Sequence, residues 1–162
     1  MKALLQRVSQ AHAEWVDSDP SGEVIAEIGS GLVVLLCADR ADEDETNDGK
    51  AGKEAAAFLA RKVANMRIFG DDDGKMNRSL LDTGGQALVI SQFTLAADWR
   101  KGNRPGFSDG AGFEAAENLW RYFCECLSGE GVDAVMGRFR SHLRIHLIND
   151  GPVTIWMDTA DR

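Results

Sequence analysis

The pattern of apolar residues along the chain predicts strands grouped around two helices. Strand-like alternation or short apolar runs occupy 2–9, 12–16, 24–28, 32–36, 86–91, 132–135, 139–148 and 153–157. Apolar residues recur at helical spacing from about 50 to 66 and again from Phe113 to Leu127, which precedes Ser128 and Gly129. This order is neither a strict strand–helix alternation nor a helical bundle, so we expect a mixed α/β fold.

Three segments refine this picture. The run Leu32–Leu36 is apolar without interruption, which favours a strand covered on both faces. Asp17–Gly22 has the composition of a turn. The stretch 39–48 carries much of the acidic charge, and we interpret it as a solvated loop leading into the first helix.

Length and composition favour one domain spanning 1–162. The chain has 162 residues, 44% of them hydrophobic, which suffices for one core and is short for two. It contains neither a run of about 18 apolar residues nor a signal-peptide pattern, so we expect a cytoplasmic protein without a membrane partner. A net charge of −8 is not typical of a nucleic-acid binder, because phosphate binding normally requires surplus Lys and Arg. The charge is uneven, so local basic patches remain possible; we expect no DNA partner.

The cysteines and histidines do not predict a metal site. An odd count of cysteines (Cys37, Cys124 and Cys126) favours reduced thiols, and two cysteines that are two apart on a helix point away from each other. His12 lies far from the other histidines in the sequence. His142 and His146 would lie about 13 Å apart on one side of a strand, so shared ligation is not expected.

Gly70–Lys75 resembles two ligand-binding loops and matches neither. It is one residue too short for a Walker loop, and Met76 stands where Ser or Thr would hold magnesium. As a calcium loop it lacks the glycine required at the sixth position. We therefore interpret this stretch as a turn.

Basic residues alternate near the C-terminus. On a strand over 139–148, one face would carry Arg138, Arg140, His142, Arg144 and His146. Such a face is either simply solvated or a phosphate-contacting surface, and the sequence leaves both interpretations open. The same alternatives apply to a smaller cluster formed by Arg100, Lys101 and Arg104.

Two further stretches raise questions of chemistry. Ser91–Leu95 (SQFTL) places polar residues directly after an apolar strand, where hydroxyls usually cap backbone groups. In 147–156 (LINDGPVTIW), Pro152 cannot donate to a β-ladder, so it belongs at an edge, a turn or a bulge.

Taken together, these motifs resemble the D-aminoacyl-tRNA deacylase (D-tyrosyl-tRNA deacylase) family. Gln6-Arg7-Val8 and Gly74–Asn77 add to the resemblance, which follows the family's order over essentially the whole chain. It implies two helices packed on a sheet with a second sheet beneath, a homodimer, and no metal or cofactor. The implied reaction is hydrolysis of the ester that joins a D-amino acid to the 3′ end of tRNA, so the implied partner is aminoacyl-tRNA.

The resemblance also implies a site. A cis Gly151-Pro152 bond would project into the partner subunit's active site and reject L-aminoacyl groups with its backbone carbonyls, while D-aminoacyl groups and glycine mischarged on tRNA-Ala would pass. The opposite wall would be formed by Ser91, Gln92, Phe93 and Thr94. Arg7 would support the gate. The motif residues Met76 and Asn77 receive no role.

Some residues depart from the family pattern. Cys37 stands where glycine is usual, Gly106 replaces a serine and Leu143 a methionine, and 17–21 and 42–50 resemble loop insertions. None of these touches SQFTL or Gly151-Pro152. The alternative function is a non-catalytic tRNA or nucleotide-binding module, because related domains are attached to aminoacyl-tRNA synthetases. The intact gate and SQFTL motif favour the enzyme.

Overall fold

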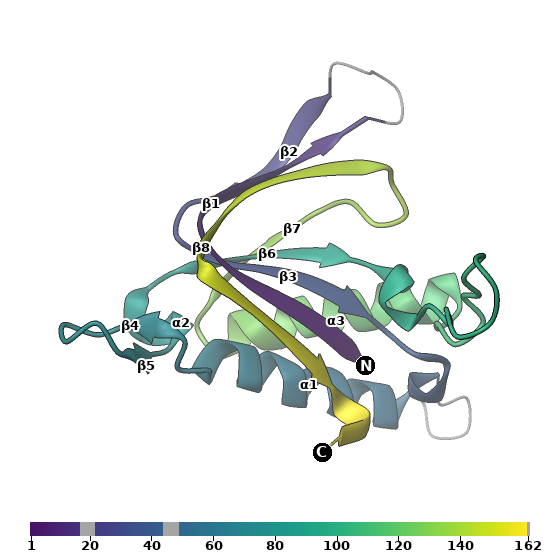
Figure 1. Ribbon diagram of the computed structural model, residues 1–162. Coiled ribbons are helices and arrows are strands. Elements are labelled where there is room, and N and C mark those ends of the chain that lie inside the picture. The colour runs from purple at the N-terminus through teal and green to yellow at the C-terminus, as the bar shows by residue number, and fades with distance from the viewer. Residues whose placement is uncertain (17–21, 44–48, 162) are drawn as a thin grey trace.

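A curved sheet with two long helices on one face organises the chain (Figure 1). The computed structural model describes residues 1–16, 22–43 and 49–161. The main sheet contains β1 (Lys2–Trp15), β2 (Glu23–Ile28), β3 (Gly31–Cys37), β6 (Gln86–Ser91), β7 (Asp133–Met136) and β8 (Leu143–Asp158). The strand order is β2-β1-β3-β6-β7, and β8 also pairs with β1. Strands β3, β6 and β7 are parallel, whereas β1 is antiparallel to β2, β3 and β8.

The remaining elements are helices and a small hairpin. The long helices are α1 (Lys50–Asn65) and α3 (Phe113–Gly129), and a single turn forms α2 (Leu80–Thr83). Strands β4 (Phe69–Gly70) and β5 (Met76–Arg78) form the hairpin. Short 3-10 helices are η1 (Arg40–Asp42), η2 (Phe93–Ala96) and η3 (Thr159–Asp161). None of the helices in the described ranges combines the length and apolarity needed to cross a bilayer.

The predicted layers are confirmed, although the second sheet is part of the first. Helices α1 and α3 cover one face, and β2 with the adjoining halves of β1 and β8 folds over the other (Figure 1). Two apolar clusters fill the two interfaces. Leu32 and Val34 of β3 belong to the cluster beneath the helices, and Val33 belongs to the cluster between the sheet layers. Burying each such side chain stabilises the fold by about 1.5–3 kcal/mol.

Strand β3 begins with a close approach to its parallel neighbour. A Cβ atom at Gly31 would lie 1.9 Å from the carbonyl oxygen of Gln86, which no side chain could tolerate. Glycine therefore allows β3 and β6 to start side by side. The prediction that Leu32–Leu36 forms a strand covered on both faces is confirmed.

Strand β1 corrects the prediction of two strands at 2–9 and 12–16. It runs unbroken from Lys2 to Trp15, with register shifts against β8 between Gln6 and Val8 and between Val8 and Gln10. Such bulges insert residues without ending a strand and increase its bend. Leu5 consequently packs beneath the helices, whereas Val8 packs between the sheet layers.

The predicted strand 139–148 is wrong over its first part, because β8 begins at Leu143. Arg140 has a positive φ of 54°, which a strand does not accommodate. The guanidinium of Arg138 lies 3.8 Å from the ring centroid of Trp15. That of Arg140 lies 4.4 Å from the ring centroid of Phe113. The continuous basic face is therefore absent from the described structure, and only its strand residues Arg144 and His146 share one face.

Other predictions agree more closely with the structure. The two long helices, the strand 86–91 and the turn at Gly70–Lys75 are confirmed, the turn being closed by Asp71 Oδ1, which accepts hydrogen bonds from the N–H groups of Asp73 and Lys75. The described structure contains free cysteines at all three positions. Residues 17–21 of the predicted turn and 44–48 of the acidic stretch lie outside the described residues.

Candidate functional site

The residues Ser91–Thr94 lie where β6 ends and η2 begins. The Gln92 N–H donates to the carbonyl of Leu36 at 2.7 Å, which fixes the motif to the end of β3. The side-chain amide of Gln92 donates to Thr94 Oγ1 at 2.5 Å. Phe93 and Thr94 open a helix, where backbone N–H groups lack an intrahelical acceptor. The motif thus presents a hydroxyl and backbone donors on one exposed turn.

An apolar wall flanks this turn. Phe93 is 54% exposed, and its ring meets Phe107 edge to face, with 5.2 Å between centroids. Behind it, the Cys37 thiol lies 3.6 Å from the Phe93 carbonyl oxygen. Burial, reinforced by the Asp39 carboxylate, raises the pKa of Cys37 to about 11. The thiol is therefore protonated and neutral at physiological pH.

The Gly151-Pro152 bond lies in a turn within β8. The bond is cis, as the resemblance implies. Asn149 closes the turn: its Oδ1 accepts from the Val153 N–H at 2.9 Å, and its Nδ2 donates to the Val153 carbonyl at 3.3 Å. Gly151 has φ 147°, a conformation that L side chains rarely adopt. Both Gly151 and Pro152 are exposed.

Arg7 of β1 contacts this turn. Its Nε donates to the Asp150 carbonyl at 2.9 Å, and its Nη1 donates to the carbonyl of Ile68. Its side chain is only 14% exposed, and Nε lies 3.6 Å from the Asp150 carboxylate. Arg7 thereby joins the turn to the segment that leads into β4.

Within one chain, the turn and the Ser91–Thr94 motif lie at opposite ends of the sheet. Asn149 pairs with Val8, which pairs with Gly31 at the start of β3, whereas Ser91 pairs with Leu36 near the end of β3. Thr154, on the other side of the turn, aligns through Gln6 with Val33. At about 3.3 Å per residue, the separation along β3 is therefore roughly 10–17 Å. Figure 1 shows the same arrangement, with the bend of β8 far from the segment that follows β6.

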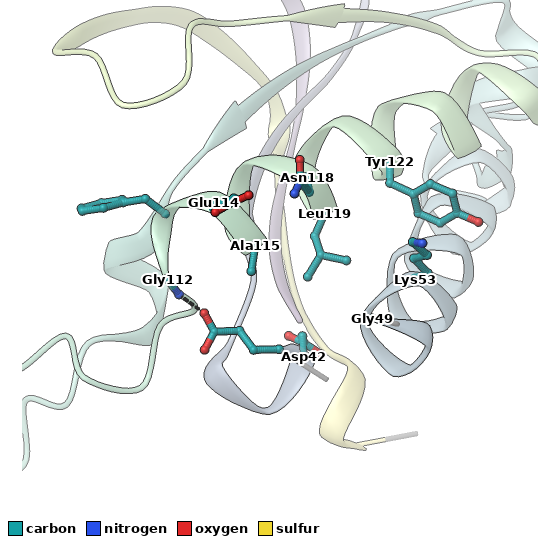
Figure 2. Close-up of a pocket in the computed structure, with 11 residues that line it drawn as sticks. Asp42, Gly49, Lys53, Gly112, Glu114, Ala115, Asn118, Leu119 and Tyr122 are labelled. Carbon is teal, nitrogen blue, oxygen red and sulfur yellow. Dashed lines mark hydrogen bonds between the residues drawn. The ribbon is translucent and has the colours of Figure 1, made fainter. Parts of the chain in front are cut away.

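The hollow beside the motif is too small for a substrate. Ser91 and Phe93 help to line a space of about 10 Å³. A larger pocket of about 500 Å³ lies elsewhere, between η1 and the first turns of α1 and α3 (Figure 2). Lys53 and Tyr122 are among its lining residues, and none of the predicted site residues is. The predicted wall is therefore an open surface in a single chain.

The small basic cluster lies on the loop that follows η2. Arg100, Lys101 and Arg104 are all exposed, and Trp99 beside them is 76% exposed. The Arg100 guanidinium donates to Asp98 at 2.8 Å and holds the pKa of that carboxyl below its usual value. The basic charge of this loop is thus partly neutralised. Asn77, by contrast, lies on the β4–β5 hairpin, where its carbonyl accepts from Arg67 at 2.7 Å.

The structure also assembles a group that the sequence interpretation missed. His12 on β1 pairs directly with His146 on β8, and Glu14 lies between their Nε2 atoms. The sequence spacing considered only His142 and His146. The signal that was needed is the register between the first and last strands, which periodicity does not contain.

Comparison with known proteins agrees with this fold. The model of the family described as D-Tyr-tRNA(Tyr) deacylase matches residues 4–158. The chain therefore belongs to the D-Tyr-tRNA(Tyr) deacylase family. It is similar to proteins named D-aminoacyl-tRNA deacylase from Ruegeria pomeroyi (51% identity, covering 98% of this chain and 99% of the relative) and Paracoccus denitrificans (49% identity, covering 100% and 99%).

Solved structures show the same architecture. A protein titled c-Myc DNA Unwinding Element Binding Protein matches with a TM-score of 0.83 and 34% identity, covering 98% of this chain and 99% of its own. A structure titled as a probable eukaryotic D-amino acid tRNA deacylase matches with a TM-score of 0.75, covering 96% of this chain and 97% of its own. Its 18% identity supports the fold alone.

Proposed function

We propose that the chain hydrolyses the ester bond between a D-amino acid and the 3′ end of tRNA, acting as a homodimer with a chiral gate at Gly151-Pro152. Family membership over 4–158 carries the reaction: the protein is a D-aminoacyl-tRNA deacylase. The distance between the turn and the Ser91–Thr94 motif supports the homodimer.

A gate in one chain cannot serve the motif of the same chain. The two lie roughly 10–17 Å apart along β3, beyond the contact distance of a single aminoacyl group. A two-fold dimer resolves this, because each turn can then face the motif of its partner. The exposed Phe93 and the tiny hollow beside it fit a wall that a second subunit completes.

A gate formed by main-chain atoms discriminates between configurations at the α-carbon and does not depend on the identity of the side chain. Glycine at 151 keeps the backbone bare, so a carbonyl can approach the substrate's α-carbon closely. An L side chain would be driven against the carbonyls, whereas a D side chain would point away. Rejection by a clash is steeper than recognition of one extra group. Glycine has no side chain to reject, so glycine that is mischarged on tRNA-Ala passes the same gate.

The chemistry relies on position more than on a protein nucleophile. An internal threonine needs an adjacent base, but Thr94 Oγ1 receives a hydrogen bond from the amide of Gln92, which cannot accept a proton. The 2′-OH of the terminal adenosine adjoins the ester and can assist attack or activate water. Backbone N–H groups of Phe93 and Thr94 at the start of η2 would stabilise the developing oxyanion.

Ester loss from D-tyrosyl-tRNA and L-tyrosyl-tRNA tests this proposal directly. We expect fast loss of the D-ester and protection of the L-ester. Binding of both without hydrolysis would instead establish a non-catalytic tRNA-binding module. Sedimentation at the assay concentration tests the homodimer separately, because a fully active monomer would refute the shared gate without refuting the reaction.

A further inference from the structure

We propose that His12, Glu14 and His146 form a binding site for a divalent ion of the zinc class, which links the first and last strands of the main sheet. The proposal rests on the geometry of these three side chains and is independent of the deacylase reaction. It concerns the outer face of β1 and β8, away from the Ser91–Thr94 motif.

Strand pairing brings the three ligands to one point. His12 and Glu14 are two residues apart on β1, so their side chains share a face. His146 is the direct cross-strand partner of His12. The two imidazoles are stacked, with centroids 4.4 Å apart and an interplanar angle of 10°. The ligand atoms of all three residues lie within 4.8 Å of one another.

These distances are close to those that a tetrahedral ion imposes. Zinc bonds of about 2.0–2.1 Å place neighbouring ligand atoms about 3.3 Å apart. Here a Glu14 carboxylate oxygen lies 3.2 Å from His146 Nε2, and the other lies 3.7 Å from His12 Nε2. Because the two rings are stacked nearly parallel, they must turn out of the stack for both Nε2 lone pairs to converge on one ion. Two imidazoles and a carboxylate form a zinc ligand set that leaves a fourth position for water.

The Glu14 carboxylate has ion-pair contacts, but one of its oxygens has no hydrogen bond. Its Oε2 is buried and accepts no hydrogen bond from the described residues. Buried carboxylate oxygens are normally satisfied, so an atom like this one requires an explanation. The Arg144 guanidinium lies 3.5 Å away and offers the charge that an ion would replace. A bound cation would satisfy Oε2 and hold both imidazoles.

Titration of chelator-treated protein tests the site. Zn²⁺ binding would be followed by calorimetry, and Co²⁺ binding by its visible absorption. We expect one ion per chain. His12→Asn and His146→Asn should each weaken binding by more than about 100-fold, the upper effect of losing an outer partner. Glu14→Gln should also weaken it. All three side chains are partly exposed on an outer face, and far-UV circular dichroism would check that each variant is folded.

Two further variants sharpen the result. His142→Asn removes a histidine outside the cluster, so its affinity should equal that of the unmodified chain. Arg144→Gln should raise the affinity, because it removes a cation that competes for Glu14. Three results would overturn the proposal. These are absence of binding, affinity of His12→Asn and His146→Asn equal to that of the unmodified chain, and unchanged affinity in Arg144→Gln. A cobalt–thiolate absorption band would also overturn it, because it would place the ion on a cysteine.

Discussion

Replacing Arg7 by methionine tests whether this residue positions the gate. Methionine has similar length and retains the packing of the stem, but it removes the donors to the carbonyls of Asp150 and Ile68. A hydrogen bond from a charged donor contributes about 1.5–3 kcal/mol. In the variant, water can replace the lost donor at the Asp150 carbonyl, because that carbonyl lies on an exposed turn. Ile68 is only 7% exposed, so the loss of the donor to its carbonyl accounts for most of the effect. We therefore expect Arg7→Met to lower the free energy of unfolding by about 2–4 kcal/mol.

Urea unfolding at fixed protomer concentration would measure this loss, because the stability of the proposed dimer would depend on concentration. Arg7→Lys keeps the charge but not the fork of donors, so it should lose about half as much. Arg78→Met is a matched control: its partner Asp72 is 91% exposed, and such a pair contributes less than about 1 kcal/mol.

The same variant should also lose chiral discrimination. A turn that Arg7 no longer holds should admit L-aminoacyl groups. Each 1.4 kcal/mol lost from the discrimination against them lowers the D-to-L ratio of hydrolysis about tenfold. Two results would refute the reasoning. Stability within about 0.5 kcal/mol of the unmodified chain would show that the bonds contribute little. Lower stability with an unchanged D-to-L ratio would make Arg7 a structural residue only.

Three further predictions concern chemistry, specificity and pH. Thr94→Ala should slow hydrolysis without abolishing it, while tRNA ending in 2′-deoxyadenosine should be nearly inert; an inactive variant with normal turnover of the deoxy substrate would make Thr94 the nucleophile. Glycyl-tRNA should be hydrolysed measurably and L-alanyl-tRNA spared, and equal protection of both would mean that the site requires a D side chain. The free energy of unfolding should fall as the pH rises from about 9 to about 11, because the unfolded Cys37 thiol ionises near 9.0 and the folded one, whose pKa burial raises, only near 11. Chemical denaturation across this range should show a smaller fall in Cys37→Ala, and an equal fall would contradict the assignment.

The local pattern of apolar residues predicted the elements that have a distinct periodicity or an uninterrupted apolar run. The helix over 50–66 and the strand 86–91 follow from apolar spacing, and β3 follows from its uninterrupted apolar run. The strand over 139–148 failed because alternating Arg and Phe side chains mimic a strand, while the positive φ of Arg140 leaves no trace in hydrophobicity. One-turn elements such as α2 and η2 are too short to show a period.

The candidate site shows the same division. The motifs at Ser91–Thr94 and Gly151-Pro152 could be found through family resemblance, because each is a contiguous string. Their separation along β3 could not, since it depends on strand order and register. The contact between His12 and His146 likewise depends on pairing between strands at the two ends of the chain.

The positions of the turn and the motif within one chain have a consequence for inheritance. In the proposed dimer, the Gly151-Pro152 turn of one subunit completes the site at the Ser91–Thr94 motif of the other. A chain with a damaged gate and a chain with a damaged motif are then each defective alone but complementary together. Their mixed dimer combines both lesions at one site and leaves the other site with an intact turn and an intact wall. One allele that damages the gate and one that damages the motif, expressed in the same cell, would therefore restore deacylation that is selective for D-aminoacyl groups, whereas two alleles that damage the same element would not.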